Sequence, residues 1–95
     1  MKKHVSILGS TGSIGLNCLK IFSSKKNLFQ INILIANRNY SLICKQILKY
    51  KPKIFIVNDT KVFLKVKNRF KKNKVKIFQN IDFKNKYFKK SDITI

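Results

Sequence analysis

The sequence predicts an α/β fold built on a doubly wound parallel sheet. Five short apolar segments alternate with amphipathic segments along the 95 residues. The apolar segments run continuously instead of alternating with polar residues, which is typical of strands buried on both faces of a parallel sheet. All three glycines of the chain fall in one window directly after the first apolar segment. These observations favour strands joined by right-handed helical crossovers.

The five apolar segments have the lengths and residue types of strands. Each of the five segments contains β-branched or aromatic residues, which favour an extended backbone. The predicted strands are residues 5–8 (VSIL), 30–36 (QINILIA), 53–58 (KIFIVN), 75–79 (VKIFQ) and 92–95 (DITI).

The first intervening segment, residues 13–24, has helical periodicity. Ile14, Cys18, Ile21 and Phe22 recur at spacings of three and four residues. Such spacings place side chains on one side of a helix. We expect this side to pack against the sheet.

Two further helices are predicted, over residues 41–51 and 60–72. Pro52 blocks continuation of the first, because proline has no N–H to donate, and Asp59 or Thr60 is suited to cap the second. Residues 82–90 fit either a short helix or an irregular connection. The expected buried residues of the two helices are Leu42, Ile43, Ile47, Tyr50, Val62, Phe63, Val66 and Phe70.

The length of the chain bears on its completeness. Ninety-five residues accommodate one domain, and neither a repeat nor a linker divides them. A parallel strand normally has neighbours and helices around it, yet the chain ends at Ile95 within an apolar segment. We therefore expect residues 1–95 to be an incomplete N-terminal domain.

The net charge of +19 arises from 22 Lys and Arg against three Asp and no Glu. A basic chain suggests nucleic acid as a partner. However, Lys, Ile, Asn and Phe contribute 20, 14, 10 and 8 residues, and all four are encoded largely by A and T. We attribute most of the charge to compositional drift, and we do not expect nucleic-acid binding.

The thiols and the apolar runs exclude several classes of protein. Cys18 and Cys44 stand far apart without a CxxC pattern, and the chain has one histidine, so we expect no zinc site. Reduced thiols indicate a reducing compartment, and we expect the cytoplasm. No apolar run approaches the roughly 20 residues of a membrane span. The run after Met1 stops at Gly9, so no signal peptide is expected.

The glycine window has the form G-x-x-G-x-x-G, between a predicted strand and a predicted helix. Gly9 suits a tight turn, Gly12 lets the backbone approach a pyrophosphate, and Gly15 lets the helix lie close to the sheet. The helix N-terminus then presents N–H groups to the phosphates. No Gly-Lys-Ser/Thr ends the window, so a Walker loop is excluded. Hydroxyl donors in the window are Ser10, Thr11 and Ser13.

The end of the second predicted strand distinguishes the two nicotinamide cofactors. Sites for NAD usually hold an acid there, which binds the ribose 2′-hydroxyl. This chain has Arg38 there and no acid before Asp59. Arginine pairs with a 2′-phosphate through charge-assisted hydrogen bonds, whereas a carboxylate repels it. We therefore predict NADP(H), not NAD(H), in a Rossmann-like domain.

The residues around the glycine window resemble a particular family. Residues 5–15 (VSILGSTGSIG) are similar to the N-terminal signature of the 1-deoxy-D-xylulose 5-phosphate reductoisomerases. That family carries an Ala-Gly-Lys-Asn-like segment after its second strand, which stands here as residues 36–39 (ANRN). Residues 50–53 (YKPK) and 91–95 (SDITI) are similar too. The resemblance spans the whole chain but only the first part of such an enzyme.

The resemblance implies an NADPH-dependent oxidoreductase of non-mevalonate isoprenoid synthesis. Its substrate is a phosphosugar, 1-deoxy-D-xylulose 5-phosphate, and its product is 2-C-methyl-D-erythritol 4-phosphate. It also implies a divalent metal, Mg²⁺ or Mn²⁺, and is compatible with a homodimer of the full enzyme.

The resemblance also assigns cofactor contacts by position. Thr11, Gly12, Ser13 and Ile14 are expected at the dinucleotide phosphates, and the Asn37–Arg38–Asn39 turn around the 2′-phosphate. Asn37 stands for the family's usual glycine, and Arg38 for lysine. The expected cofactor-binding residues are Gly9, Ser10, Thr11, Gly12, Ser13, Ile14, Gly15, Asn37, Arg38 and Asn39.

The resemblance also sets a limit on activity. The family's metal ligands are an Asp and two Glu in a later domain, and this chain has no Glu. The family's substrate-phosphate site and catalytic loop have no counterpart here. We therefore expect no catalytic or metal-binding residue and no turnover by these 95 residues alone. Two alternatives stay open: another NADP-dependent oxidoreductase, and a basic nucleic-acid-binding module.

Overall fold

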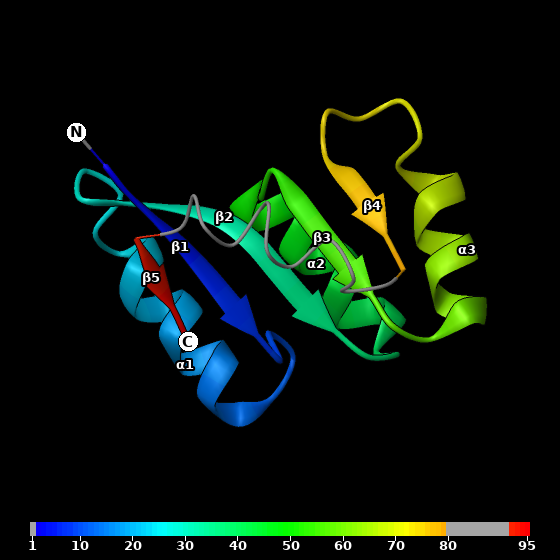
Figure 1. The fold of residues 1–95 in the computed structure, drawn as a ribbon, viewed down its shortest axis with the longest axis horizontal. Helices are drawn as coiled ribbons and strands as arrows, with labels where there is room; N and C mark the ends of the chain where they lie inside the picture. The colour runs from blue at the N-terminus through cyan, green and yellow to red at the C-terminus, as the bar shows by residue number, and fades with distance from the viewer. Residues whose placement is uncertain (1, 80–91) are drawn as a thin grey trace.

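The chain folds into a parallel sheet with helices along its crossovers (Figure 1). The computed structural model describes residues 2–79 and 92–95, so the segment predicted over residues 82–90 lies outside the described residues. The predicted strands and helices within the described residues are confirmed, with small shifts at their ends. They are β1 (Lys3–Leu8), α1 (Ser13–Ser23), β2 (Phe29–Ala36), α2 (Tyr40–Tyr50), β3 (Ile54–Val57), α3 (Thr60–Arg69), β4 (Lys76–Phe78) and β5 (Ile93–Thr94).

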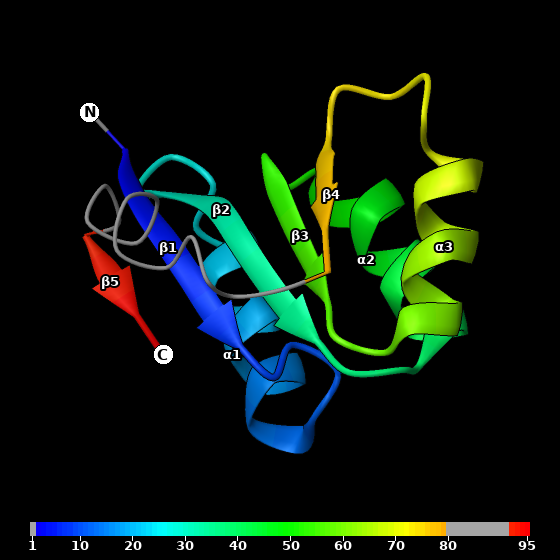
Figure 2. The ribbon, with the colours of Figure 1, turned by 45° about the vertical axis from the view of Figure 1, so that its right-hand side comes forward.

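The order of the strands creates a point where the chain changes direction across the sheet. The order is β4-β3-β2-β1-β5, and every neighbouring pair is parallel. The steps from β1 to β4 run one way, and β5 then lies on the other side of β1. In open α/β sheets, ligands bind outside the carboxyl ends of the strands at such a reversal. Figure 2 shows the turns after β1, β2 and β3 together at that edge.

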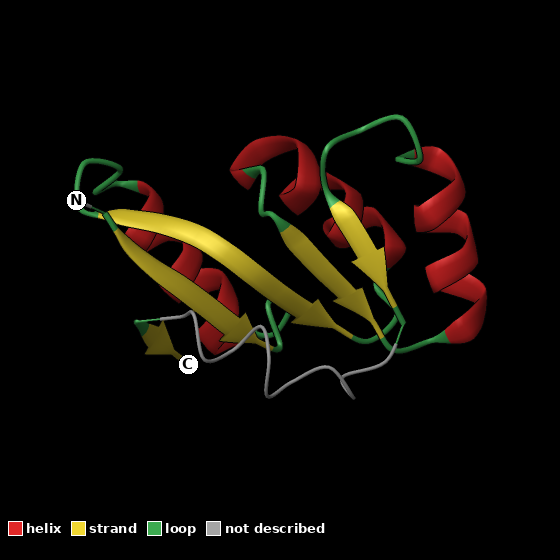
Figure 3. Ribbon diagram, turned by 45° about the horizontal axis from the view of Figure 1, so that its top comes forward, coloured by secondary structure: helices red, strands yellow, loops and turns green. Residues whose placement is uncertain are grey.

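The three helices of the described residues pack on one face of the sheet (Figure 3). Right-handed crossovers that step repeatedly in one direction place their helices on the same face. One core cluster therefore joins helix residues such as Leu19, Ile43 and Val66 to strand residues such as Val5 and Phe55. A second cluster on the opposite face consists of Ile33, Ile35, Ile54 and Ile56.

The packing of α1 differs from the prediction. Ile14 and Ile21 are 74% and 57% exposed, so the expectation that they face the sheet was wrong. Gly15 and Leu19 are buried instead, and Phe22 packs half-buried against the core. The helix is rotated about its axis relative to the predicted orientation, because Gly15 lies against the preceding loop. This contact brings the side of the helix that carries Gly15 and Leu19 toward the sheet.

The starts of α2 and α3 are capped by side chains. Asn39 Oδ1 accepts a hydrogen bond from the Leu42 N–H at 3.2 Å. Asp59 Oδ2 accepts one from the Val62 N–H at 3.0 Å, which makes Asp59 the cap of the two predicted candidates. Such caps satisfy N–H groups that a helix leaves without partners in its first turn.

The helix ends follow from local backbone geometry. α2 stops before Pro52, as predicted, with Lys51 in the left-handed region at φ 49°. α3 ends at Arg69, three residues earlier than predicted, because Phe70 leaves the helical region and buries its ring. None of the helices in the described residues has the length and apolarity needed to cross a bilayer.

The cap of α3 is open to a direct test. We expect Asp59→Ala to lower the free energy of unfolding by about 1 kcal/mol, because the Val62 N–H loses its acceptor. Urea denaturation measures this change. Asp59→Asn keeps an acceptor and should retain most of the stability. An equal loss in both variants would contradict the capping role and indicate a charge effect instead.

Candidate functional site

The glycine loop, residues 9–15, leaves β1 at its carboxyl end. Gly9 has φ +77°, a conformation that L side chains rarely adopt. The N–H groups of Gly9 and Ser10 both donate to the Ile35 carbonyl of β2, at 2.8 and 2.9 Å. The Gly12 N–H donates to the Gly9 carbonyl at 3.1 Å. These bonds hold the loop across the ends of two neighbouring strands.

Gly15 is required by the packing of α1 on this loop. A Cβ at Gly15 would lie 2.2 Å from the Gly9 carbonyl oxygen and 2.9 Å from the Ser10 Cα. Because both neighbours are backbone atoms, no flexible side chain can move aside. Gly15 was predicted to let the helix lie close to the sheet, and the close approach that the structure shows is to the backbone of the loop.

Gly12, unlike Gly15, has room for a side chain. A Cβ there would meet only the Gly9 carbonyl oxygen, at 3.5 Å, which is an ordinary contact. Gly12 is exposed, and it is the N-cap residue of α1 with φ −81°. The chain's own packing does not require glycine here, so the room in front of Gly12 suits the close approach of a ligand.

The start of α1 differs from the starts of α2 and α3. No side chain caps α1, and no acidic residue lies in its first turn. Its first N–H groups and the positive end of its dipole lie beside the exposed Gly12. This arrangement is suited to bind a phosphate.

The side chains of the loop divide between surface and interior. Ser13 and Ile14 are exposed and Thr11 is half-buried, so their positions allow contact with a ligand. Ser10 is fully buried, and its hydroxyl oxygen has no hydrogen-bond partner in the part of the chain that the structure describes. Of the three predicted hydroxyl donors, the Ser10 hydroxyl thus lies inside the protein in this structure.

The turn after β2, residues 37–39, lies at the same edge of the sheet. All three of its residues are exposed. The Asn37 carbonyl accepts a hydrogen bond from the Asp59 N–H at 3.0 Å, which ties this turn to the one after β3. Asn39 also caps α2. Sequence analysis missed this role, although an Asn directly before an amphipathic segment is a known capping signal.

The two arginines have different surroundings. Interaction with the Tyr40 side chain is the main cause that raises the pKa of Arg69. Arg38 is exposed in the turn after β2. Within the described residues the acids are Asp59 and Asp92, and the carboxylate of each accepts a backbone N–H. Arg38 is therefore the charged side chain of the turn itself, and Asp59 lies in the neighbouring turn after β3.

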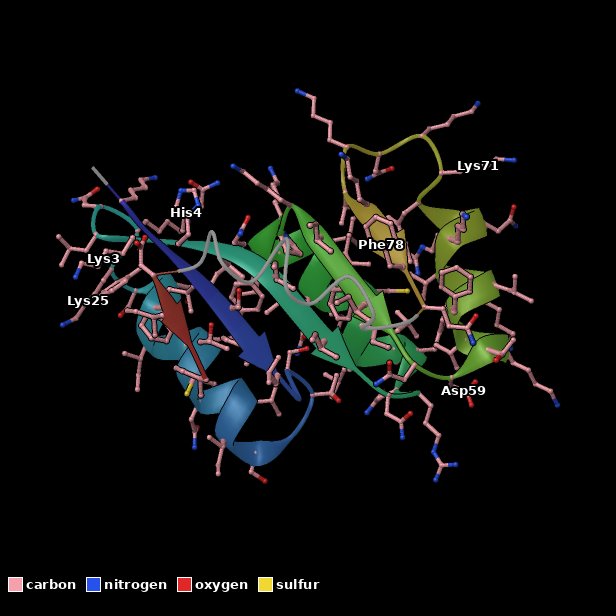
Figure 4. All side chains as sticks on the ribbon, viewed as in Figure 1. Lys3, His4, Lys25, Asp59, Lys71 and Phe78 are labelled. Atoms are coloured by element: carbon pink, nitrogen blue, oxygen red, sulfur yellow. The ribbon has the colours of Figure 1, made fainter. Side chains whose placement is uncertain are left out.

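The lysines do not gather at this edge. Every lysine of the described residues is exposed. Figure 4 shows Lys3 and Lys25 at one end of the molecule and Lys71 at the other, beyond the end of α3. A spread of this kind matches compositional drift better than a single basic surface for a nucleic-acid backbone.

Sequence analysis also missed Gln46 of α2. Gln46 is 2% exposed, and its Nε2 donates to the Ser10 carbonyl of the glycine loop at 2.8 Å. The signal was a polar residue three positions after Ile43, on the buried side of the predicted helix. A buried polar side chain at such a position usually has a specific partner.

A metal site was not expected in this chain. Within residues 2–79 and 92–95, His, Cys, Asp and Glu side chains do not gather in groups of three. These described residues do not fit a divalent cation. Cys18 and Cys44 are free thiols.

The parallel sheet, its reversal beside β1 and the glycine loop that opens an uncapped helix define an α/β domain of the Rossmann-like class. The family model of 1-deoxy-D-xylulose 5-phosphate reductoisomerase matches residues 5–94. This chain therefore belongs to that family, which confirms the resemblance predicted from the sequence.

Individual relatives agree with this assignment. The 1-deoxy-D-xylulose 5-phosphate reductoisomerase of Pelagibacter ubique is 42% identical over 86 residues, which cover 90% of this chain and 22% of the relative. That of Wigglesworthia glossinidia brevipalpis is 41% identical over 75 residues, or 78% of this chain and 19% of the relative. The chain thus spans about a fifth of the length of these relatives.

Solved structures share the fold. The reductoisomerase of Zymomonas mobilis in complex with NADPH has a TM-score of 0.78 at 24% identity and covers 87% of this chain and 22% of that one. A reductoisomerase in complex with magnesium has a TM-score of 0.85 at 16% identity. The match covers 99% of this chain and 24% of that one.

The two glycines of the loop should respond differently to the same substitution. We expect Gly15→Ala to lower the free energy of unfolding by about 2 kcal/mol, because its Cβ collides with backbone. Gly12→Ala is the matched control and should cost less than about 1 kcal/mol, since only a cap preference changes. Chemical denaturation compares the two. Equal stabilities of the two variants would show that α1 does not depend on its contact with the loop.

Proposed function

We propose that this chain binds NADPH as the N-terminal part of a reductoisomerase that converts 1-deoxy-D-xylulose 5-phosphate into 2-C-methyl-D-erythritol 4-phosphate. The observation that carries the proposal is the uncapped start of α1 at the exposed Gly12, on the same edge as Arg38. Family membership supports the reaction. The Zymomonas mobilis relative of the same fold is in complex with NADPH, which supports the cofactor.

The glycine loop binds the two linked phosphates of the cofactor. The first N–H groups of α1 donate to the phosphate oxygens, and the helix dipole adds to this attraction. Gly12 allows the phosphates close to the backbone, and the Thr11 and Ser13 hydroxyls supply further donors. Gly9 and Gly15 act through the shape of the loop, and the contribution of Ser10 is through its backbone.

The turn after β2 selects NADPH over NADH. The guanidinium of Arg38 pairs with the 2′-phosphate, a dianionic group that NADH lacks. The exposed amide of Asn37 and the turn at Asn39 surround the same group. When bound, NADPH supplies a hydride; these residues only hold and orient it.

The remaining parts of the activity lie outside the matched region. A solved relative binds NADPH, fosmidomycin and magnesium together. We propose that a divalent metal and the phosphosugar are held by segments that the longer relatives have beyond the part matched here. We also propose that the full enzyme is a homodimer. We further propose a cytoplasmic location, because the two free thiols are typical of a reducing compartment.

Arg38 provides the test of cofactor choice. We expect Arg38→Glu to weaken NADPH binding at least about tenfold, because a charge-assisted pair becomes a repulsion. The affinity for NADH should change by less than about threefold. Fluorescence titration with both cofactors measures the preference.

The matched control is Lys71→Glu, which changes the net charge equally at an exposed residue beyond α3. It should leave the preference for NADPH intact. Equal effects of the two variants would reject a specific role for Arg38. Binding of a nonspecific DNA duplex with steep salt dependence, and without NADPH binding by the native chain, would favour the nucleic-acid alternative.

The limit on activity is tested with the same 95 residues. We expect no oxidation of NADPH when 1-deoxy-D-xylulose 5-phosphate and Mg²⁺ are supplied, because the described residues provide no metal site. Absorbance of NADPH follows the reaction, and a complete reductoisomerase serves as the positive control. Turnover that copurifies with the chain through successive columns would contradict the expectation.

A further inference from the structure

Gln46 links two segments that lie far apart in the sequence. Its side chain is almost fully buried, and its Nε2 donates to the Ser10 carbonyl, 36 residues earlier in the chain, at 2.8 Å. Ser10 also belongs to the glycine loop, whose Gly9 and Ser10 N–H groups are bound to β2. The Gln46 amide therefore secures the loop from the side of α2.

The energetics of this contact point away from a purely structural role. The Gln46 Oε1 and the Ser10 hydroxyl oxygen are both buried and have no hydrogen-bond partner among residues 2–79 and 92–95. Unpaired buried polar atoms destabilise a fold, so these two atoms offset part of the stability that the hydrogen bond from Gln46 to Ser10 contributes. The net stability gained from the amide is therefore reduced, whereas its hydrogen bond still fixes the position of the loop.

The helix that carries Gln46 also begins at the turn that holds Arg38. Asn39 of that turn caps it. One helix thus touches the glycine loop through Gln46 and carries the turn after β2 at its start. We propose that Gln46 is a positioning residue that holds the pyrophosphate-binding loop at a set distance from the 2′-phosphate turn.

This inference rests on the proposed NADPH binding, and two ligands separate the two sites. NADPH needs both the glycine loop and the turn after β2. Adenosine 2′-monophosphate has the 2′-phosphate but no pyrophosphate, so it needs the turn alone. Loss of positioning should weaken the first ligand selectively, whereas damage to α2 as a whole should weaken both.

The experiment uses the 95-residue chain with Gln46→Met, which has a similar length but no amide. We expect NADPH to bind about tenfold more weakly, the size of one lost hydrogen bond. Adenosine 2′-monophosphate should bind within about twofold of the native affinity. Nuclear magnetic resonance titration measures both. Exchange of the Gly12 amide proton should also be faster in the variant.

Two further variants keep the test decisive. Gln46→Asn retains the amide but shortens its reach, and should show the same selective loss. Ile47→Val shortens a buried side chain of α2 next to Gln46 and leaves the Gln46 amide in place, and it should leave both affinities unchanged. Unchanged NADPH affinity, or an equal loss for both ligands, would overturn the inference. Failure of the native chain to bind NADPH would overturn the proposed function itself.

Discussion

The carboxyl edge of the sheet depends on one contact, between α1 and the loop that precedes it. No Cβ fits between Gly15 and the Gly9 carbonyl, so the helix starts directly against backbone. This closeness turns Leu19 toward the core and Ile14 toward solvent. It also leaves Gly12 and the first turn of α1 exposed at the edge where the strand order reverses. The geometry of the proposed phosphate site is therefore a consequence of how tightly the helix packs.

The strands and the glycine loop could be predicted because their signals are local. Continuous apolar runs mark buried parallel strands, and a glycine cluster after a strand marks a loop with unusual backbone. The rotation of α1 could not be predicted in the same way. Its apolar residues, Ile14 and Ile21 among them, surround the helix, and the inner side is chosen by the loop contact at Gly15. A bulge in β2 could not be predicted either. Val5 pairs with Ile31 but Ser6 pairs with Ile33, and no pattern of residue types indicates this shift in register.

The composition and the fold are nearly independent of each other in this chain. Lysine is the commonest residue, and every lysine of the described residues lies at the surface. The described core is formed mainly by Ile, Val, Leu and Phe. Drift toward lysine is tolerated because a charged side chain costs little where its head group stays in water. Positions that resist the drift are therefore informative, and Arg38 and the three glycines are such positions.

The site at this edge is held together by backbone carbonyls rather than by side-chain charges. The Ile35 carbonyl receives the glycine loop, and the Asn37 carbonyl receives the turn after β3. The Ser10 carbonyl receives the amide of Gln46. The Asn37–Asp59 bond joins two turns, whereas the other bonds join the glycine loop to β2 and to α2. Within the described residues, this edge is therefore held by hydrogen bonds, which salt screens less than surface ion pairs. In a chain of charge +19, such a hydrogen-bonded frame does not depend on the exposed lysines, and Arg38 is the charge on which the proposed choice of cofactor rests.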